Sequence, residues 1–461
     1  MGFAPLSPPY EHYRYDANIM TEYRARRLPA DLRGSGWYEI LDPPPPAREL
    51  EGAHTADWII VGAGFAGLSA ARRLARTRPG ERIVLIEAQR VGWGAAGRNS
   101  GFMIDLPHDL TSESYGGRHA KNVAEIKLNR AAMAFAREAA EEIGLPRNVF
   151  EACGKYHGAT DGHGLKELRA FEKHLDSLGE PYSKLDAADM KRITGTGYYD
   201  GGSFMPGTVI IQPAAYVRAL AGSLGPNVSL YERSPVLRFK TGREHTVHTA
   251  KGSVSAPRLI LTVNGHIESF GFFQRRLMHV FLYGSMTRRL TAGEVRTLGG
   301  EPAWALIPAA TMGSTVRRLH EDRIVVRNSI TWAPGMQVGA RDVERFRRTH
   351  EASFRARFPM LPDVTMEHSW SGHLCMSLNS APGFGEIAER VYSACVCNGL
   401  GVTKSTLAGM LIADHATGAG GPMVEAMLAA PKPSRLPPEP FASIGARARL
   451  WWGQRQAGRD L

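Results

Sequence analysis

Three glycines and one glutamate are the residues whose types and spacing most clearly indicate chemistry. Gly62, Gly64 and Gly67 form the pattern G-x-G-x-x-G, and Glu87 lies 20 residues beyond the last glycine. In this pattern the first glycine permits a tight strand-to-helix turn, the second lets the backbone approach a pyrophosphate, and the third lets helix and strand pack closely. The N–H groups that begin the helix face the phosphates, and a carboxylate at Glu87 accepts both ribose hydroxyls. The four residues therefore predict a dinucleotide site.

The segments around these residues have the composition that such a site needs. Residues 58–61 (WIIV) are a short apolar run typical of a buried parallel strand, residues 68–75 are rich in helix formers, and residues 82–86 are a second apolar run that delivers Glu87. Strand, helix, strand and terminal acid together indicate a Rossmann-type βαβ unit, whereas the glycines alone would be weak evidence. The sequence has one such unit and no C-x-x-C motif, which disfavours a disulfide reductase with two dinucleotide domains.

The loop after the second strand distinguishes FAD from NAD. Residues 86–101 (IEAQRVGWGAAGRNSG) resemble a motif of the D-amino-acid oxidase (DAO) superfamily, and most closely its branch of γ-glutamylputrescine oxidase, glycine oxidase and small D-amino-acid dehydrogenases. In that family the stretch runs along the flavin, so the resemblance implies an FAD-dependent oxidoreductase. Ala96 stands where the family usually has serine, which removes a hydroxyl contact to the pyrophosphate. Arg98 and Asn99 are suited to neutralise phosphate or to hydrogen bond to the ring.

Later segments repeat the resemblance. Residues 231–236 (YERSPV) are similar to the family strand whose valine backbone holds the adenine, and residues 259–265 (LILTVNG) to the strand and turn that follow. Residues 370–373 (WSGH) and 397–406 (CNGLGVTKST) look like the closing segments, in which a glycine turn and a helix N-terminus stabilise the negative charge of the reduced flavin. The motifs assign to FAD the residues Gly62, Gly64, Phe65, Ala66, Gly67, Glu87, Ala88, Arg90, Gly94, Ala95, Ala96, Gly97, Arg98, Asn99, Ser100, Gly101, Val236, Asn264, Gly265, Asn398, Gly399, Gly401, Val402, Thr403 and Lys404.

The resemblance also implies a reaction. Family members oxidise a C–N bond of an amine or amino acid: a hydride moves to flavin N5, and water hydrolyses the resulting imine. The protein holds the neutral amine over N5 and excludes water. By position alone, His373, Arg317, Tyr283 and Trp332 are candidates for the substrate pocket, and Arg317 is suited to pair with a substrate carboxylate. The electron acceptor is oxygen or a quinone, between which the sequence does not decide.

Cys375 raises the question of a covalent flavin. In the sarcosine oxidase relatives a cysteine just after a basic residue in this segment bonds to the cofactor, and Cys375 lies two residues after His373. A buried, inert thiol is the commoner role of a free cysteine. We therefore expect FAD to be bound without a covalent link.

Two other functions stay open. A flavin monooxygenase that uses NAD(P)H shares the glycine motif, but such enzymes usually have Gly-Asp before the last flavin helix, where this chain has Asn398-Gly399. The other alternative is a flavin-bearing subunit of a larger complex with little activity alone. The oligomeric state is open as well.

The separation of the motifs along 461 residues indicates two interleaved domains in an α/β (α+β) fold. We expect a discontinuous Rossmann-type FAD-binding domain and a mixed-sheet substrate domain, preceded by an arm that wraps a later domain and followed by a tail. The expected bounds are 1–50 for the arm, 51–114, 206–265 and 369–430 for the FAD-binding domain, 115–205 and 266–368 for the substrate domain, and 431–461 for the tail.

Periodicity predicts the remaining elements. Helices are expected at 119–143, 164–178, 213–224 and 402–415, and strands at 228–232, 245–249, 258–263, 278–287, 323–331 and 391–396. The charged segment 341–358 is interpreted as an exposed helix. The tail ends in an Arg-rich amphipathic helix with Trp451 and Trp452, which is expected to pack on its own domain rather than to lie at a membrane surface.

Composition excludes several partners. The net charge is +11, but the basic residues occur at most in pairs and no helix-turn-helix or zinc-finger pattern accompanies them, so no nucleic-acid partner is expected. The four cysteines are too few and too irregular for a disulfide framework, and no metal site is predicted. The N-terminus lacks the plan of a signal peptide, and no window of eighteen residues is apolar without charge. A cytoplasmic location is the expectation.

Overall fold

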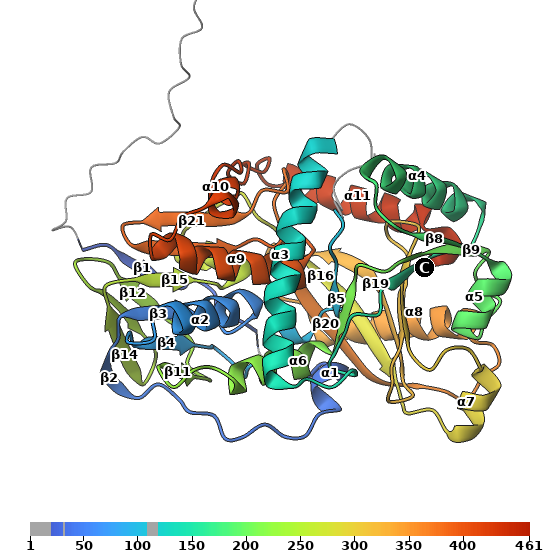
Figure 1. Cartoon of the computed structure of the whole chain (residues 1–461), viewed down its shortest axis with the longest axis horizontal. Coiled ribbons are helices and arrows are strands. Elements are labelled where there is room, and N and C mark those ends of the chain that lie inside the picture. The colour runs from blue at the N-terminus through green and yellow to red at the C-terminus, as the bar shows by residue number, and fades with distance from the viewer. Residues whose placement is uncertain (1–19, 31–32, 108–118) are drawn as a thin grey trace, which may run out of the picture.

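The computed structural model describes residues 20–30, 33–107 and 119–461, which divide into two halves (Figure 1). One half contains a six-stranded sheet between a layer of helices and a second, smaller sheet. The other half contains an eight-stranded mixed sheet with helices beside it. The long helix α3 (His119–Ile143) runs across the middle of the molecule (Figure 1).

The six-stranded sheet has the order β11-β4-β3-β15-β22-β21. All neighbours are parallel except the last pair. Its central strands are apolar along their whole length because both faces are covered. The strands are β11 (Val228–Tyr231), β4 (Ile83–Ile86), β3 (Trp58–Val61), β15 (Leu259–Leu261), β22 (Val391–Cys395) and β21 (Gly383–Ala388).

Alternate residues of these strands face the two covering layers. Trp58 and Ile60 of β3 pack with the helices, whereas Ile59 and Val61 pack with the small sheet. The helices on the first face are α2 (Phe65–Thr77), α6 (Pro213–Gly222), α9 (Gly401–Ala416) and α3, and the short α10 (Pro422–Leu428) packs on α9. The small sheet has the order β1 (Glu22–Arg24), β12 (Arg238–Lys240), β13 (His245–His248), β14 (Gly252–Ala256), β2 (Gly52–Thr55).

The eight-stranded sheet forms the other half. Its neighbours are antiparallel except β17 and β7. In spatial order the strands are β20 (Met366–Met376), β16 (Met278–Thr287), β19 (Ile324–Trp332), β18 (Thr315–Arg318), β17 (Trp304–Pro308), β7 (Lys155–Ala159), β9 (Gly201–Met205) and β8 (Ser183–Asp186). The helices of this half are α4 (Gly162–Leu178), α5 (Ala187–Thr194), α7 (Ala292–Leu298), α8 (Ala340–Arg357) and α11 (Phe441–Gln456). The strands β5 (Phe102–Met103), β10 (Val209–Ile211) and β6 (Phe150–Glu151) form a separate three-stranded sheet.

The sequence predicted most elements of both halves. The helix expected over 119–143 has these bounds in α3, and the strand expected over 278–287 has these bounds in β16. The helices expected at 164–178 and 402–415 are α4 and α9, each begun one or two residues earlier. The fold class predicted for the chain is confirmed.

Helix α8 corrects one expectation. The charge of segment 341–358 predicts an exposed helix, but α8 buries Phe346, His350, Phe354 and Arg357 against the eight-stranded sheet. These residues recur at three- and four-residue spacing, so the helix is amphipathic despite its many arginines.

Some of the expected domain bounds fall inside helices or strands rather than between them. The bound at 369 falls inside β20, which begins at Met366 and belongs to the eight-stranded sheet. The bound at 265 falls inside the 3₁₀ helix η2 (Asn264–Phe270), and the bound at 114 lies outside the described residues.

The described part of the expected arm contacts both halves. Strand β1 pairs with β12 in the small sheet. Helix α1 (Gly36–Glu39) contacts α6 and β20, and its Trp37 is completely buried beside Trp370. The arm thus joins the two halves before the glycine motif begins.

Candidate cofactor and substrate site

The glycine turn between β3 and α2 has the geometry that its spacing predicts. Gly62 has φ +102°, and a Cβ there would lie 2.9 Å from the carbonyl oxygen of Thr262. A Cβ on Gly67 would lie 1.7 Å from the carbonyl oxygen of Gly62, so only glycine lets the helix approach the strand this closely. Gly64 instead has open space, since a Cβ there would have Cβ of Ala96, at 3.6 Å, as its nearest neighbour. Two of the glycines are therefore steric requirements, and the third leaves room for a ligand.

The first turn of α2 is available to an anion. Gly64 is the N-cap of the helix and contributes no side-chain cap, so no side chain of the cap satisfies the first N–H groups. These groups and the positive end of the helix dipole meet at the cavity lined by Gly64, Phe65 and Ala66. This is the arrangement that binds a pyrophosphate.

Glu87 is held in place by the backbone of the same turn. Its Oε2 accepts a hydrogen bond from Ala63 N at 2.8 Å, and its Oε1 accepts one from Gln89 N at 3.0 Å. Burial raises the pKa of this carboxyl, and the two N–H groups act in the opposite direction. Each carboxylate oxygen has a further lone pair, so Glu87 is oriented to accept two ribose hydroxyls.

One cavity collects most of the predicted cofactor residues. Those that line it are Gly62, Gly64, Phe65, Ala66, Glu87, Ala88, Arg90, Gly94, Ala95, Ala96, Arg98, Asn99, Val236, Asn264, Gly399 and Gly401. The others predicted for FAD do not line it: Gly67, Gly97, Ser100, Gly101, Gly265, Asn398, Val402, Thr403 and Lys404. The cavity joins segments that lie between Ala25 and Ser405, as a discontinuous dinucleotide domain requires.

The residues that stay outside the cavity support its walls. A Cβ on Gly97, in the 3₁₀ helix η1 (Ala95–Gly97), would lie 1.8 Å from the carbonyl oxygen of Gly92. Thr403 Oγ1 donates to the carbonyl oxygen of Ile104, and Lys404 forms an ion pair with Glu125 at 2.9 Å. These positions shape the site without facing it.

Arg98 and Asn99 line the cavity but use their polar atoms on the protein. Arg98 Nε donates to the carbonyl oxygen of Trp93 and Nη1 to that of Ser371, and the side chain is buried. Asn99 Oδ1 accepts from Gly101 N, and its Nδ2 donates to the carbonyl oxygen of Ala96. The two side chains therefore fix the loop to itself and to β20, a structural task that the sequence did not distinguish from phosphate binding.

The arm supplies a wall that sequence reasoning missed. Residues 25–30 of the arm contribute Ala25, Arg27, Leu28, Pro29 and Ala30 to the cavity. Gln89 Nε2 donates to the carbonyl oxygen of Ala30 at 2.8 Å, and Arg27 Nη1 donates to that of Pro334 at 2.7 Å. No motif marks this segment, and its only signal is that an aromatic, basic stretch precedes the glycine turn.

Histidines line a further part of the cavity, which we call its histidine end. His373 of β20 and His266 of η2 line it together with Phe281. His373 Nε2 and His279 Nδ1 are 3.1 Å apart, and His279 Nε2 is 2.7 Å from Glu268 Oε2. The sequence indicated only His373; the pairing of β16 with β20 brings His279 to it.

Burial keeps the two cavity histidines neutral. It lowers the pKa of His266 to about 4, and it lowers the pKa of His373 well below the ordinary histidine value. Neighbouring imidazoles act in the same direction. Nδ1 of His266 is buried and has no hydrogen-bond partner in the described structure. This end of the cavity therefore presents neutral imidazoles to a ligand.

Gly265 explains how the histidines come so close to η2. A Cβ at this position would lie 2.7 Å from Cε1 of His373, 3.0 Å from Cε1 of His279 and 3.0 Å from Cβ of Cys375. The absence of a side chain at Gly265 lets η2 lie directly on β16 and β20. Cys375 is consequently sealed in the hydrophobic core with no exposure, and burial raises the pKa of its thiol well above the ordinary value.

Three of the four predicted substrate residues do not line the cavity. Arg317 is buried in β18, where Nη1 donates to the carbonyl oxygens of Ser100 at 2.8 Å and Ile211 at 2.9 Å. Tyr283 hydrogen bonds to Thr331 at 2.8 Å. Trp332 Nε1 donates to Ser443 Oγ of α11 at 2.9 Å. Each polar group that suggested substrate binding is instead a link between segments of the chain, and of the four only His373 lines the cavity.

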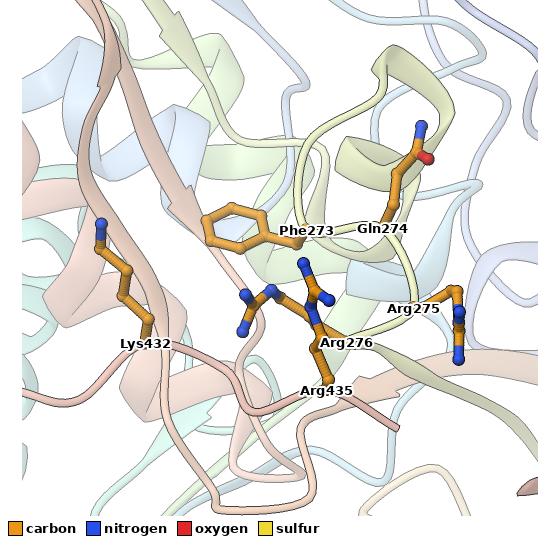
Figure 2. A pocket seen from close by; sticks show the side chains of 6 residues that line it. All are labelled: Phe273, Gln274, Arg275, Arg276, Lys432 and Arg435. Carbon is orange, nitrogen blue, oxygen red and sulfur yellow. The ribbon is translucent and has the colours of Figure 1, made fainter. Parts of the chain in front are cut away.

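A second cavity of about 430 Å³ lies between the loop that precedes β16 and the tail (Figure 2). Its lining residues are Phe273, Gln274, Arg275 and Arg276 from the loop between η2 and β16, with Lys432 and Arg435 from the tail. The loop holds Glu268, because Arg275 N donates to Glu268 Oε1 at 2.8 Å. Among the described residues the lining of this second cavity is mostly cationic and includes no carboxylate, and its loop is linked to Glu268 of the histidine group.

Metal clusters and membrane spans are both missing from the described residues. No group of three or more His, Cys, Asp or Glu side chains suited to a metal ion occurs in residues 20–30, 33–107 and 119–461. Within the same ranges, no helix combines the length and apolar character needed to cross a membrane.

Comparison with known proteins gives consistent matches. The model of the family "DAO: FAD dependent oxidoreductase" matches residues 57–415. The chain is 26% identical over 377 residues to gamma-glutamylputrescine oxidoreductase of Escherichia coli (strain K12), covering 80% of this chain and 85% of that protein. It is 28% identical over 405 residues to the probable oxidoreductase OrdL of Rhizobium meliloti (strain 1021), covering 84% and 89%. Glycine oxidase from Geobacillus kaustophilus shares the fold, with a TM-score of 0.64, 20% identity, and coverage of 79% of this chain and 95% of that one.

Proposed function

Because the chain belongs to the DAO family of FAD-dependent oxidoreductases, we propose that it oxidises a C–N bond of an amine or amino acid to an imine that water then hydrolyses. FAD is its cofactor. The observation that supports the proposal is that one cavity is lined both by the carboxylate of Glu87 and by neutral histidines. The substrate and the acceptor, whether oxygen or a quinone, are matters for experiment.

The residues of the cavity fit an FAD molecule. Glu87 would hold the ribose, and the N-terminus of α2 with the open position at Gly64 would hold the pyrophosphate. The loop with Ala95 and Ala96 presents only methyl groups and backbone, which allow a flat ring to lie against it. We expect the link to be non-covalent, since Cys375 is sealed in the core and does not line the cavity.

Bound FAD supplies the hydride acceptor for the carbon next to the substrate nitrogen. An amine donates this hydride only when its nitrogen is not protonated, so the protein must remove a proton from the substrate ammonium. His266 and His373 are both neutral bases that line the cavity, and the one hydrogen bonded onward to His279 is His373. We assign it that task.

The hydrogen bonds around His373 define where its basic nitrogen lies. Glu268 carries a carboxylate, which only accepts, so His279 Nε2 carries a hydrogen and its Nδ1 is the acceptor. His373 Nε2 must then donate to that Nδ1, which leaves Nδ1 of His373 as the free acceptor. A proton taken up there is passed on as His373 gives its Nε2 hydrogen to His279, and His279 gives its own to Glu268.

Glu268 is the outer end of this chain of groups. Its side chain is 24% exposed, whereas that of His279 is 2% exposed. The proton therefore moves from the cavity to a carboxylate that reaches solvent. This path removes the proton without a water molecule having to enter beside the substrate, which would protect the imine until it leaves.

The apolar part of the cavity wall indicates which kind of substrate would fit. Phe281, Met336 and Leu374 line the cavity with the histidines, and among the described lining residues the carboxylate is that of Glu87. Such a wall favours a neutral amine nitrogen with an apolar or extended chain. Arg27 is the cationic residue of the arm that lines the cavity and is placed to meet a substrate carboxylate if the substrate has one.

Anaerobic titration of the FAD-loaded chain with a panel of amines and amino acids tests the proposal. Bleaching of the oxidised flavin band by an amine, with the corresponding carbonyl product and ammonia or amine released, is the expected result. Bleaching by NAD(P)H and by no amine would replace the proposal with a monooxygenase. Bleaching by neither, together with stable co-purifying subunits, would replace it with a flavin-bearing subunit.

A further inference from the structure

Helix α11 leaves an apolar face uncovered. Phe441, Ile444, Trp451 and Trp452 are 67%, 61%, 59% and 57% exposed, and they are four of the nine large hydrophobic side chains exposed in the described chain. No other phenylalanine or tryptophan of the described residues is exposed. The helix runs along the outside of the half that holds the eight-stranded sheet (Figure 1). Exposed apolar side chains gathered on one helix indicate a surface that binds something.

The four side chains share one face by helical spacing. From Phe441, steps of three, ten and eleven residues reach Ile444, Trp451 and Trp452, which places all four on the side away from the protein. The opposite side is fixed to the body. Trp332 Nε1 donates to Ser443 Oγ at 2.9 Å, and Gln454 Nε2 donates to the carbonyl oxygen of Ile330 at 3.0 Å.

The end of the chain fastens the helix further. Asp460, in the 3₁₀ helix η3 (Gly458–Asp460), is buried, and its carbonyl oxygen accepts from Arg357 Nη2 at 2.7 Å. The carbonyl oxygen of Leu461 accepts from Ser314 Oγ at 2.9 Å. The apolar face is therefore presented by a helix anchored at its inner side and beyond its C-terminus, so docking requires no unfolding. The inner face of the helix packs on the body of the protein, which agrees with the expectation that the tail packs on its own domain.

The charges on α11 select an anionic partner. The helix carries Arg447, Arg449 and Arg455, and it contains no aspartate or glutamate. Arg447 and Arg449 lie on the two flanks of the apolar face by helical spacing, and the guanidinium of Arg455 lies 5.4 Å from the ring centroid of Trp451. Tryptophan between an apolar and a wet phase, with arginine at its sides, is the arrangement of helices that lie in a bilayer surface.

A second copy of the chain is a poorer partner for this face. In a two-fold contact the same surface meets itself, so the arginines of one helix would face those of the other. No carboxylate on α11 would neutralise them. We propose that α11 docks the protein on the surface of an anionic phospholipid bilayer, with Trp451 and Trp452 among the headgroups and the flanking arginines on lipid phosphates.

Flotation of the FAD-loaded full chain with vesicles tests the proposal. The chain is expected to float with vesicles of equal parts phosphatidylcholine and phosphatidylglycerol, and much less with phosphatidylcholine alone. The double variant Trp451→Ser/Trp452→Ser should lower partitioning more than about tenfold, because binding scales with the apolar area inserted. The double variant Arg447→Gln/Arg449→Gln should lower it about twenty-five-fold, at about fivefold for each arginine, and added salt should reproduce that loss.

The controls separate docking from misfolding and from self-association. Met423→Ser removes an exposed apolar side chain from α10 and should float like the unmodified chain. All variants should keep their FAD, which shows that they fold. Absence of flotation with anionic vesicles overturns the proposal, as does equal flotation with both vesicle types. A dimer in sedimentation that the double tryptophan variant dissociates, without flotation, would assign the face to a second copy instead.

Discussion

Replacing Glu268 by glutamine isolates the proposed proton path. The change keeps the size of the side chain and the acceptor for Arg275 N, but it removes the charge next to His279 Nε2. A charge-assisted hydrogen bond at 2.7 Å is worth about 1.5–3 kcal/mol, which corresponds to about one to two pKa units. The carboxylate favours a positive charge on the imidazoles that lead to it, so its loss makes protonation of His373 less favourable.

The expected readout is the pH dependence of anaerobic flavin reduction by the substrate. The acid limb should move down by about one to two pH units in Glu268→Gln, because weaker bases stay neutral to lower pH. The plateau should fall as well, since an amide cannot take the proton that a carboxylate takes. His266, the third imidazole at this wall, is unchanged and supplies no compensating charge.

Two controls make the test decisive. Glu268→Asp retains the carboxylate and should keep most of the acid limb in place. Glu425→Gln removes the same charge from the exposed surface of α10 and should change nothing. If the acid limb and plateau of Glu268→Gln match those of the unmodified enzyme, the proton does not travel through this path and the assignment of His373 is wrong.

Three further changes test other parts of the site. Gly67→Ala places a methyl group 1.7 Å from the carbonyl oxygen of Gly62, so FAD retention after desalting, read from the flavin-to-protein absorbance ratio, should fall more than about tenfold. Arg317→Met removes two hydrogen bonds from a charged group but also removes a buried cation, so urea unfolding should show a free energy of unfolding lower by about 1–3 kcal/mol. The KM should not change. A raised KM with an unchanged free energy of unfolding would instead indicate that Arg317 contacts the substrate. Burial lowers the pKa of Lys155 from the ordinary 10.5 to about 7, so between these values the unfolded chain binds more protons and stability is lost as the pH falls. Lys155→Met should abolish that slope of about 1.4 kcal/mol per pH unit, measured by urea unfolding at about pH 8 and about pH 10, and a persistent slope would place its origin in another group.

Local patterns predicted the parts of the site that are local in the chain. The βαβ unit was predictable because its strand, turn and helix are contiguous, and because steric demands at Gly62 and Gly67 leave glycine as the only residue that fits. Glu87 was predictable for the same reason, since a strand of known length delivers it to the turn. The bounds of α3 followed from a periodic apolar stripe that needs no knowledge of its partners.

Long-range packing decided the rest. Arg317 has the chemistry of a carboxylate ligand, and only the fold shows that its Nη1 donates to the carbonyl oxygens of Ser100 and Ile211. The arm contributes Ala30 to the cavity through a hydrogen bond from Gln89, a contact between segments that share no motif. The burial of Phe354 in α8 was obscured by the arginines around it, because average charge hides the spacing of a buried stripe.

The histidine group shows why substrate chemistry is harder to predict than cofactor binding. In the register between β16 and β20, His279 lies opposite Cys375 and Phe281 lies opposite His373, so the four side chains share one face of the sheet. A slip of one residue would turn His279 to the other face and disconnect His373 from Glu268. The register is fixed by ten paired positions and by the close approach of η2 that Gly265 permits, none of which is written in the residues near His373. The dinucleotide site is thus a property of a short segment, whereas the proposed base is a property of sheet register.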